Sequence, residues 1–242
     1  MERTHGRRSS VNIEVITSFD QAYYDKIGHA CVETWLKHWP SELVFTCYVE
    51  EFRLPEQARI KQIEFTELGD SYFKFQLSPV KDRVKTFAKK AYSVIHAMEH
   101  STADRVIWLD ADVLTTADIS MGMLELLCPD NVLATYMEVY HEKDNRIWIS
   151  AETGIFVVNR THPEFKAFAQ RYRQYYDEHI TENLRRFYDG EVFGAVANEF
   201  KPHVRDLCAD FKKKYKTPLR HTILGPYLNH YKSKGNKDNF NY

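Results

Sequence analysis

The most constraining feature of this sequence is a short apolar run that ends abruptly in acidic residues. Val106-Ile107-Trp108-Leu109 is followed directly by Asp110-Ala111-Asp112. A continuous apolar run of this kind is typical of a parallel strand that is covered on both faces. In open α/β sheets, ligands bind beyond the carboxyl ends of such strands. The sequence therefore predicts an α/β fold with a ligand site beside Asp110 and Asp112.

Strand-like and helix-like segments alternate along the first half of the chain. The β-rich segments are residues 12–19, 43–49 and 63–68. Residues 21–38 and 84–100 carry apolar side chains at helical spacing, and the polar stretch 71–81 is expected to be a loop. This alternation predicts βαβ connections between parallel strands.

The second half continues the mixed pattern. We expect helices over residues 119–127, 163–179 and 183–200, the last interrupted by Gly190, and strands over residues 131–139 and 155–159. A chain of 242 residues is long enough for one sizeable core, so we predict a single domain over residues 11–231. Residues 1–10 are expected to be a flexible N-terminus. Residues 232–242 are expected to be a basic tail that is disordered after Gly235.

Composition argues against several classes of protein. The hydrophobic fraction is 43%, and no apolar run approaches the roughly 20 residues that span a bilayer. No apolar segment follows the arginines of residues 1–10, so we expect a cytoplasmic protein without a secretory signal. The four cysteines lie far apart, which argues against a disulfide framework or a structural zinc site. A net charge of −1 gives no general attraction to nucleic acid.

Asp110 and Asp112 place two negative charges close together. In an extended chain, residues i and i+2 project to the same side, so the two carboxylates are neighbours. This arrangement is unfavourable unless a cation sits between them, and hard oxygen donors select Mg²⁺ or Mn²⁺, which also bind substrate phosphates. Such a site suits a diphosphate, because a Lewis acid stabilises the charge of a departing nucleoside diphosphate. The alternative is that these acids cap a solvated loop.

Residues 106–113 resemble the Asp-x-Asp strand of GT-A glycosyltransferases. Other segments are similar to that family in the same order along the chain: Phe87-Ala88-Lys89-Lys90, residues 152–159 with His162-Pro163, Tyr188-Asp189, and residues 224–235. The pattern looks like the small glycosyltransferase domains of large DNA viruses, of phages and of bacterial polysaccharide loci. The resemblance implies a GT-A fold, which is Rossmann-like, with a mixed, mainly parallel central sheet flanked by helices.

The resemblance also implies a reaction and a metal site. The chain would move a hexosyl or pentosyl group from a nucleotide diphosphate sugar, with UDP or GDP favoured, to a hydroxyl of a glycan or another acceptor. Asp110 and Asp112 would hold the nucleotide ribose and Mn²⁺ or Mg²⁺, and His230 would complete the metal site. Lys234 and Lys237 would neutralise phosphate oxygens. The alternatives are an exposed histidine and a solvated basic tail.

Four further residues are assigned to the donor by their positions. Thr17, Ser18 and Phe19 end the first strand, and in GT-A enzymes this position lines the nucleotide-base pocket. Ser18 is alternatively a cap of the following helix. Lys90, on the helix before the acidic strand, is expected to reach the diphosphate, although a lysine on an amphipathic helix more often lies on a solvated face.

An inverting enzyme needs a carboxylate base on the acceptor side of the sugar. We predict that Asp189 is this base, because apolar neighbours would partly bury it and raise its pKa. Glu191 is the rival base, and a helix-capping role at a glycine break is the alternative for Asp189. Glu152, Thr153 and Gly154, on the acceptor-side strand, are expected to bind substrate.

Three other functions compete with sugar transfer. The first is an inactive nucleotide-binding scaffold of the same fold, against which the presence of Asp110, Asp112 and His230 argues. The second is a nucleotidyl or phosphoryl enzyme, which would need a glycine-rich phosphate loop after the first strand, whereas residues 17–24 contain no glycine. The third is a phage-type glycosyltransferase that acts on modified DNA bases, guided by the basic residues 212–216.

Overall fold

The computed structural model of the chain describes residues 11–143, 146–184, 186, 188–209 and 218–231. Within this part of the chain, a central sheet has seven strands: β1 (Ile13–Asp20), β2 (Phe45–Glu50), β3 (Ile60–Glu64), β4 (Arg105–Leu109), β6 (Ala134–Lys143), β7 (Arg146–Asn159) and β8 (Val204–Asp206). Their order across the sheet is β3-β2-β1-β4-β7-β6-β8. A small second sheet pairs β5 (Val113–Thr115) with β9 (Leu228–His230).

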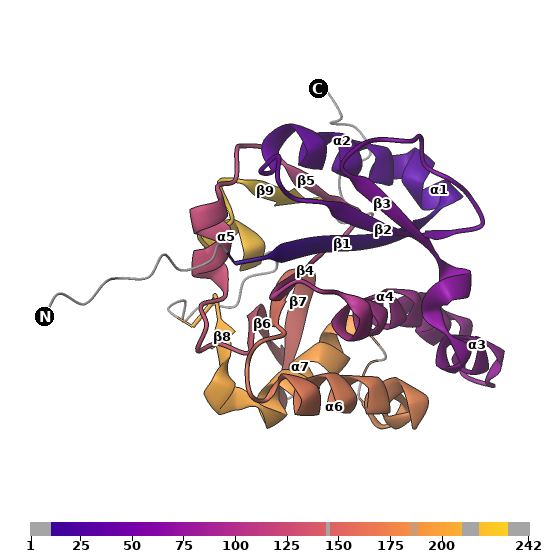
Figure 1. Cartoon of the computed structure of the whole chain (residues 1–242). Helices are drawn as coiled ribbons and strands as arrows, with labels where there is room; N and C mark the ends of the chain where they lie inside the picture. Colours follow the sequence, from indigo (N-terminus) through magenta and orange to yellow (C-terminus); the bar gives the residue numbers. More distant parts are fainter. Residues whose placement is uncertain (1–10, 144–145, 185, 187, 210–217, 232–242) are drawn as a thin grey trace, which may run out of the picture.

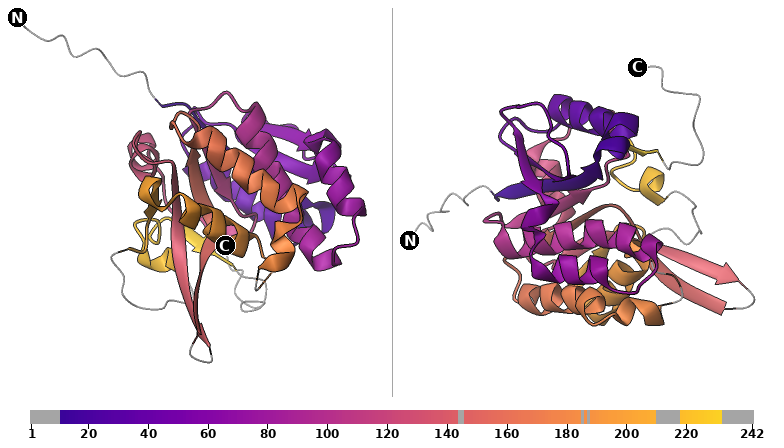
Figure 2. Two further views of the ribbon diagram at one scale, coloured as in Figure 1. Left: turned by 90° about the horizontal axis from the view of Figure 1, so that it is seen from below. Right: turned by 90° about the vertical axis from the view of Figure 1, so that its right-hand side faces the viewer.

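The strand directions place several carboxyl ends together. β1, β2, β3 and β4 run parallel, so their carboxyl ends meet at one edge of the sheet. β7 is antiparallel to both β4 and β6, and β8 is parallel to β6. The far ends of β6 and β7 extend beyond the body of the molecule as a long hairpin (Figure 2). This mixed, mainly parallel sheet confirms the predicted fold class.

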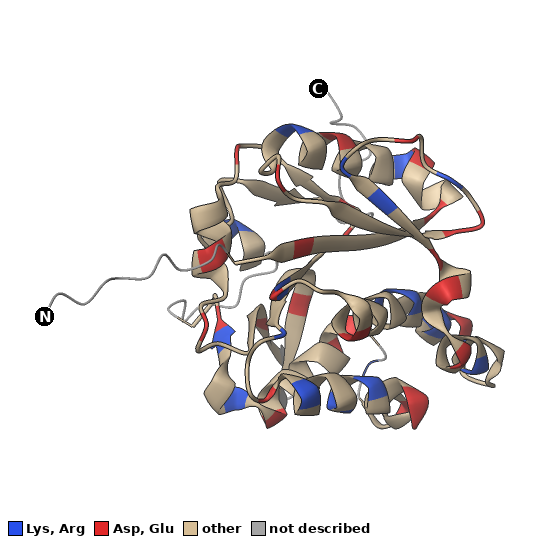
Figure 3. Ribbon diagram, in the orientation of Figure 1, with Lys and Arg blue, Asp and Glu red and all other residues tan. Residues whose placement is uncertain are grey.

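Helices cover both faces of the sheet (Figure 1). They are α1 (Gln21–Tyr23), α2 (His29–His38), α3 (Asp70–Leu77), α4 (Asp82–His100), α5 (Met121–Leu127), α6 (Phe165–Asp177) and α7 (Asp189–Glu199). No helix in the described part of the chain is long and apolar enough to cross a membrane. In the orientation of Figure 3, Lys and Arg are interspersed with Asp and Glu along the outer helices.

The apolar core lies in two layers, one against each face of the sheet. Trp108 belongs to the layer under α4, α6 and α7, whereas Ile107 and Leu109 belong to the layer under α2. Successive side chains of a strand point to opposite faces, so a strand between two apolar layers carries apolar side chains on both faces, as Val106–Leu109 do. All five residues of β4 are buried, which confirms the prediction of a strand covered on both faces.

The helix over residues 21–38 is confirmed, with a π-helical turn at Tyr24–Gly28 between α1 and α2. Two predictions about the next segment are wrong. Residues 65–68 form a 3-10 helix rather than strand, because Glu64 and Glu67 form a capping box that begins it. Residues 70–77 form α3 rather than a loop. Within this polar segment, Tyr72 and Phe75 are buried, and their rings pack on Tyr92 of α4.

Other segments differ from their predicted bounds or lie outside the described residues. β7 begins at Arg146, well before the expected start at residue 155. α7 begins at Asp189 rather than at residue 183, because residues 180–183 form a 3-10 helix and Tyr188, just before α7, has extended backbone angles. The predicted terminal segments 1–10 and 232–242, and the basic cluster 212–216, lie outside the described residues.

Gly190 lies in the first turn of α7 and does not interrupt the helix. A Cβ atom at this position would lie 2.3 Å from the backbone oxygen of Ala151 on β7. One turn later, a Cβ at Gly194 would lie 3.0 Å from the backbone of Ser150 and Ala151. The two glycines therefore allow α7 to pack directly on the β7 backbone, which fixes Asp189 and Glu191 beside that strand.

We expect Gly190→Ala to lower the free energy of unfolding by about 2–3 kcal/mol, because the added methyl group forces α7 away from β7. Gly122→Ala is the matched control, since Gly122 lies in α5 and a Cβ there meets nothing within 4 Å. It should leave stability unchanged or raise it by up to about 1 kcal/mol. Urea denaturation of both variants measures the difference. Equal stability of the two variants would contradict the close packing of α7 on β7.

Candidate active site

The acidic segment lies where β4 ends and the chain turns into β5. The backbone amide of Asp110 donates to the oxygen of Gly154 on β7 (2.8 Å), and the amide of Val113 donates to the oxygen of Asp110 (2.9 Å). β5 then pairs with β9, in which Val113 lies opposite His230. The C-terminal segment is thereby held against the carboxyl end of the parallel strands.

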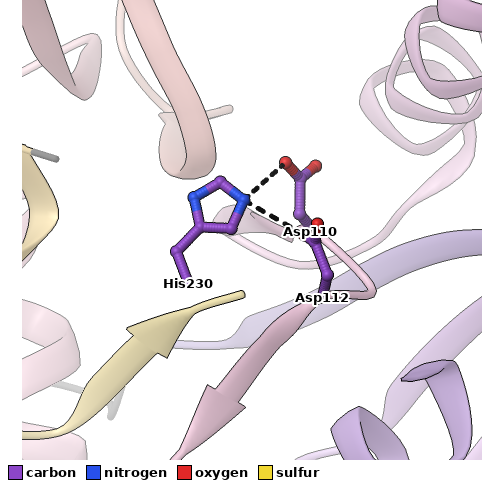
Figure 4. A group of neighbouring side chains, drawn as sticks. All are labelled: Asp110, Asp112 and His230. Carbon is purple, nitrogen blue, oxygen red and sulfur yellow. Dashed lines mark ion pairs between the residues drawn. The ribbon is translucent and has the colours of Figure 1, made fainter. Parts of the chain in front are cut away.

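The structure brings the three predicted metal ligands together (Figure 4). Asp110, Asp112 and His230 each offer one ligand atom, and these atoms all lie within 4.8 Å of one another. Nε2 of His230 lies 3.1 Å from Oδ1 of Asp112 and 3.8 Å from Oδ2 of Asp110. Two carboxylates and one imidazole are a donor set that suits Mn²⁺, so the residues present fit a divalent cation.

Without a bound cation, the carboxylates around His230 favour its protonated form. Burial favours the neutral ring, but the close contacts with Asp112 and Glu152 and the charge of Asp110 outweigh it and raise the pKa of His230 to about 10. The imidazolium then neutralises part of the acidic cluster. A bound cation would supply the same positive charge, because a ligating imidazole must be neutral.

Lys90 lies beneath the acidic segment and is not on a solvated face. Its Nζ atom lies 2.6 Å from Oδ1 of Asp110 and 2.7 Å from Oδ2 of Asp189, and it donates to the backbone oxygen of Thr153 at 2.7 Å. The ammonium also lies 5.0 Å from the centre of the Trp108 ring, whose Nε1 donates to the same oxygen of Asp110 (2.6 Å). Lys90 therefore links Asp110 to Asp189 inside the protein.

Asp189 is 8% exposed, and the expected direction of its pKa is wrong. Burial acts to raise the pKa of this carboxyl, as predicted. The charge of Lys90, with hydrogen bonds from Lys90 and from the hydroxyl of Thr153 (2.6 Å), outweighs burial and holds the pKa below its usual range. Asp189 is consequently a stable carboxylate and a weaker base than its apolar neighbours in the sequence indicate.

The other predicted acceptor-side residues lie around His230 and the start of α7. Oε1 of Glu152 lies 3.2 Å from Nδ1 of His230 and accepts from the amide of Gly154 at 3.3 Å. Glu191 is buried in the first turn of α7 and accepts from Nε1 of Trp148 at 3.2 Å. The structure thus places Glu152 and Gly154 beside His230, and Glu191 in the first turn of α7 against Trp148 of β7.

The residues expected at the nucleotide base are mostly buried. Thr17 is fully buried in β1, and the ring of Phe19 packs on Tyr24, with 5.3 Å between ring centres. Ser18 is half-buried. The side chain of Asp20 accepts from the amide of Tyr23 (2.7 Å) and caps α1, so the alternative capping role for Ser18 is wrong.

Sequence reasoning missed Tyr23, which lies at the start of the helix after β1. Its hydroxyl hydrogen-bonds to Asp112, and burial together with that carboxylate raises the pKa of Tyr23. The sequence signal was an aromatic residue just beyond the strand end where ligands were expected. The predicted phosphate-binding residues Lys234 and Lys237 lie outside the described residues.

Gly154 makes room for His230, because a Cβ at this position would lie 2.7 Å from Nδ1 and 2.9 Å from Cε1 of the imidazole. We expect Gly154→Ala to displace the ring and to weaken Mn²⁺ binding by about 10–100-fold, as loss of ligand orientation does at other metal sites. Titration of free Mn²⁺ by electron paramagnetic resonance measures this loss. Gly122→Ala, which is remote from the site, should bind Mn²⁺ as the wild type does.

No protein-family model matches the chain, and no curated protein matches its sequence. Solved structures match it by shape. The glycosyltransferase GlyE of Streptococcus pneumoniae superposes with a TM-score of 0.55 at 15% identity, over 92% of this chain and 55% of that one. The galactosyltransferase LgtC, solved with donor and acceptor sugar analogues, gives 0.55 at 14% identity, over 90% and 86% of the two chains. The chain has the GT-A fold.

Coverage of the matched proteins differs widely. The bifunctional glycosyltransferase WbbM superposes with a TM-score of 0.53 at 14% identity, over 84% of this chain but 40% of its own. The chain therefore spans two fifths of WbbM and about half of GlyE. The GT-A chain carries its acidic cluster at the carboxyl ends of the parallel strands, where α/β sheets bind ligands.

Proposed function

We propose that this GT-A chain is a metal-dependent glycosyltransferase that moves a sugar from a nucleotide diphosphate sugar to an acceptor hydroxyl. The observation that carries the proposal is the cluster of Asp110, Asp112 and His230 at the sheet edge. The likeness to solved structures named as glycosyltransferases supports it. UDP and GDP are the favoured nucleotides.

Asp112 and His230 would hold the cation, and Asp110 would contact both the cation and the nucleotide ribose. Mn²⁺ or Mg²⁺ at this site would stabilise the negative charge of the leaving diphosphate as a Lewis acid. Lys90 and Trp108 hold Oδ1 of Asp110, which leaves Oδ2 on the side of His230. Lys90 and Trp108 would thus hold Asp110 in position as a ligand before the donor arrives.

For the acceptor side, the lowered pKa of Asp189 shifts our proposal for the base to Glu191. Both side chains lie in the first turn of α7. Asp189 is ion-paired with Lys90, and Glu191 accepts from Nε1 of Trp148. Asp189 would instead anchor Lys90 and Thr153 beneath the sugar. A Glu191→Gln variant that retains wild-type kcat would contradict this assignment.

Calorimetric titration with UDP, GDP, CDP and TDP, with and without Mn²⁺, tests the proposed function. We expect one nucleotide to bind only when the metal is present, and Asp112→Asn to abolish that binding. Transfer or hydrolysis of the corresponding nucleotide sugars then separates an enzyme from an inactive scaffold. Absence of metal-linked binding for all four nucleotides would overturn the proposal.

A further inference from the structure

The two ring nitrogens of His230 face different carboxylates. Nε2 lies 3.1 Å from Oδ1 of Asp112, on the side of the proposed cation, and Nδ1 lies 3.2 Å from Oε1 of Glu152. Among the described residues Nδ1 has no directed hydrogen bond, so its contact with Glu152 is an ion pair.

Glu152 lies beside the metal ligands but outside their cluster. Among the described residues, the ligand atoms that lie within 4.8 Å of one another come from Asp110, Asp112 and His230. The side chain of Glu152 is only 10% exposed, and the amide of Gly154 donates to its Oε1 atom. The β7 backbone therefore helps to hold this carboxylate in place.

β7 supplies both the carboxylate and the space that His230 needs. Glu152 and Gly154 are two residues apart on this strand, so they face the same side of it. The missing Cβ of Gly154 leaves room for Nδ1 and Cε1 of the imidazole. β9, which carries His230, pairs with β5 in the small sheet, so Glu152 ties the ligand on β9 to a strand of the central sheet.

We propose that Glu152 is a positioning residue for His230: its carboxylate accepts the Nδ1 proton and thereby directs Nε2 at the cation. A metal-ligating histidine commonly donates its other ring proton to a carboxylate, which fixes the tautomer and the orientation of the ring. This inference rests on the proposed metal-dependent function. It differs from the prediction that Glu152 binds the sugar or the acceptor.

Mn²⁺ binding without donor, followed by electron paramagnetic resonance of the free ion, tests this role. Glu152→Ala should raise the dissociation constant for Mn²⁺ about 10–100-fold. Glu152→Gln keeps an oxygen that accepts from Nδ1, so its constant should rise by less than about tenfold. With Co²⁺ as the probe, the visible ligand-field bands should change in Glu152→Ala and stay unchanged in Glu152→Gln, because they report coordination geometry.

Glu138→Gln is the matched control. Glu138 lies on the neighbouring strand β6, is buried like Glu152, and pairs with Lys201 instead of His230. The substitution removes the same charge from the same sheet, and the Mn²⁺ dissociation constant should stay within about twofold of wild type, as expected of independent sites.

Two results would overturn the positioning role. Equally large losses in Glu152→Ala and Glu152→Gln would mean that the charge of Glu152 binds the metal directly. Unchanged Mn²⁺ constants with a raised KM for donor or acceptor would assign Glu152 to substrate binding. These two results are distinct from a third, in which the wild type itself binds no Mn²⁺. That result would overturn the proposed function as well. If circular dichroism shows that Glu152→Ala is unfolded, the Mn²⁺ dissociation constant of Glu152→Gln is compared with those of the wild type and Gly154→Ala. A rise smaller than that of Gly154→Ala supports the positioning role, and a rise as large as that of Gly154→Ala overturns it.

Discussion

Asp112→Asn is expected to reduce kcat/KM for sugar transfer roughly a thousandfold, which corresponds to about 4 kcal/mol of lost transition-state stabilisation. Oδ1 of Asp112 contacts His230, and Asp112 accepts a hydrogen bond from the hydroxyl of Tyr23, so it lies at the centre of the cluster. The neutral amide of Asn is a poor ligand for a hard cation, but the Asn side chain is almost the same size as the Asp side chain that it replaces. The loss should therefore come from the metal site rather than from a change of fold.

The matched control is Asp118→Asn. The side chain of Asp118 is 88% exposed and pairs with His38, away from the cluster. Its activity should equal that of the wild type, and both variants should unfold thermally within a few degrees of it. Chelation of divalent ions from the wild type should reproduce the loss seen in Asp112→Asn. Retention of more than a tenth of the wild-type activity in Asp112→Asn would show that the cluster is not the donor site.

The acidic end of the site could be predicted because its signals are local. An apolar run with acids two residues apart fixes both the strand and the direction in which its end points, and β4 with Asp110 and Asp112 follows that expectation. His230 could be placed only through the resemblance to a family. Its approach to Asp112 depends on the pairing of β5 with β9, two short strands far apart in the sequence.

The electrostatics of the site could not be read from neighbouring residues. The apolar sequence around Asp189 correctly indicates burial, and burial alone would raise its pKa. The opposite direction results from Lys90 on α4 and Thr153 on β7, both distant in sequence. For the same reason the sequence could not show how Lys90 is placed: helical spacing left a solvated face open as the alternative to a role at the diphosphate, and it cannot show that two carboxylates meet the ammonium of Lys90.

Lys90→Met is expected to lower the free energy of unfolding by about 3–5 kcal/mol, because it leaves buried Asp189 and partly buried Asp110 without the ammonium that pairs with both. The Lys90 side chain is 11% exposed and lies within 2.7 Å of both Asp110 and Asp189. Lys89→Met is the control. Lys89 is the preceding residue of α4 and pairs with Glu50 at a more exposed site, so its loss should cost less than about 1 kcal/mol. Urea denaturation measures both variants, and equal costs would contradict the buried network.

The pH dependence of these stabilities separates charge from packing. The pKa of Asp189 is lower in the folded chain than in the unfolded chain, so its ion pair stabilises the fold above about pH 4 and is lost as the pH falls through the folded value. Without Lys90, burial dominates and should raise the pKa of Asp189, so that Lys90→Met recovers stability as its carboxylates protonate. The difference in free energy of unfolding between wild type and Lys90→Met should therefore be larger at pH 7.5 than at pH 5. Adding Asp189→Asn to Lys90→Met should also reduce the difference from wild type in free energy of unfolding at pH 7.5, because the double variant buries one charge fewer. A difference that changes neither with pH nor with Asp189→Asn would mean that Lys90 acts through packing alone.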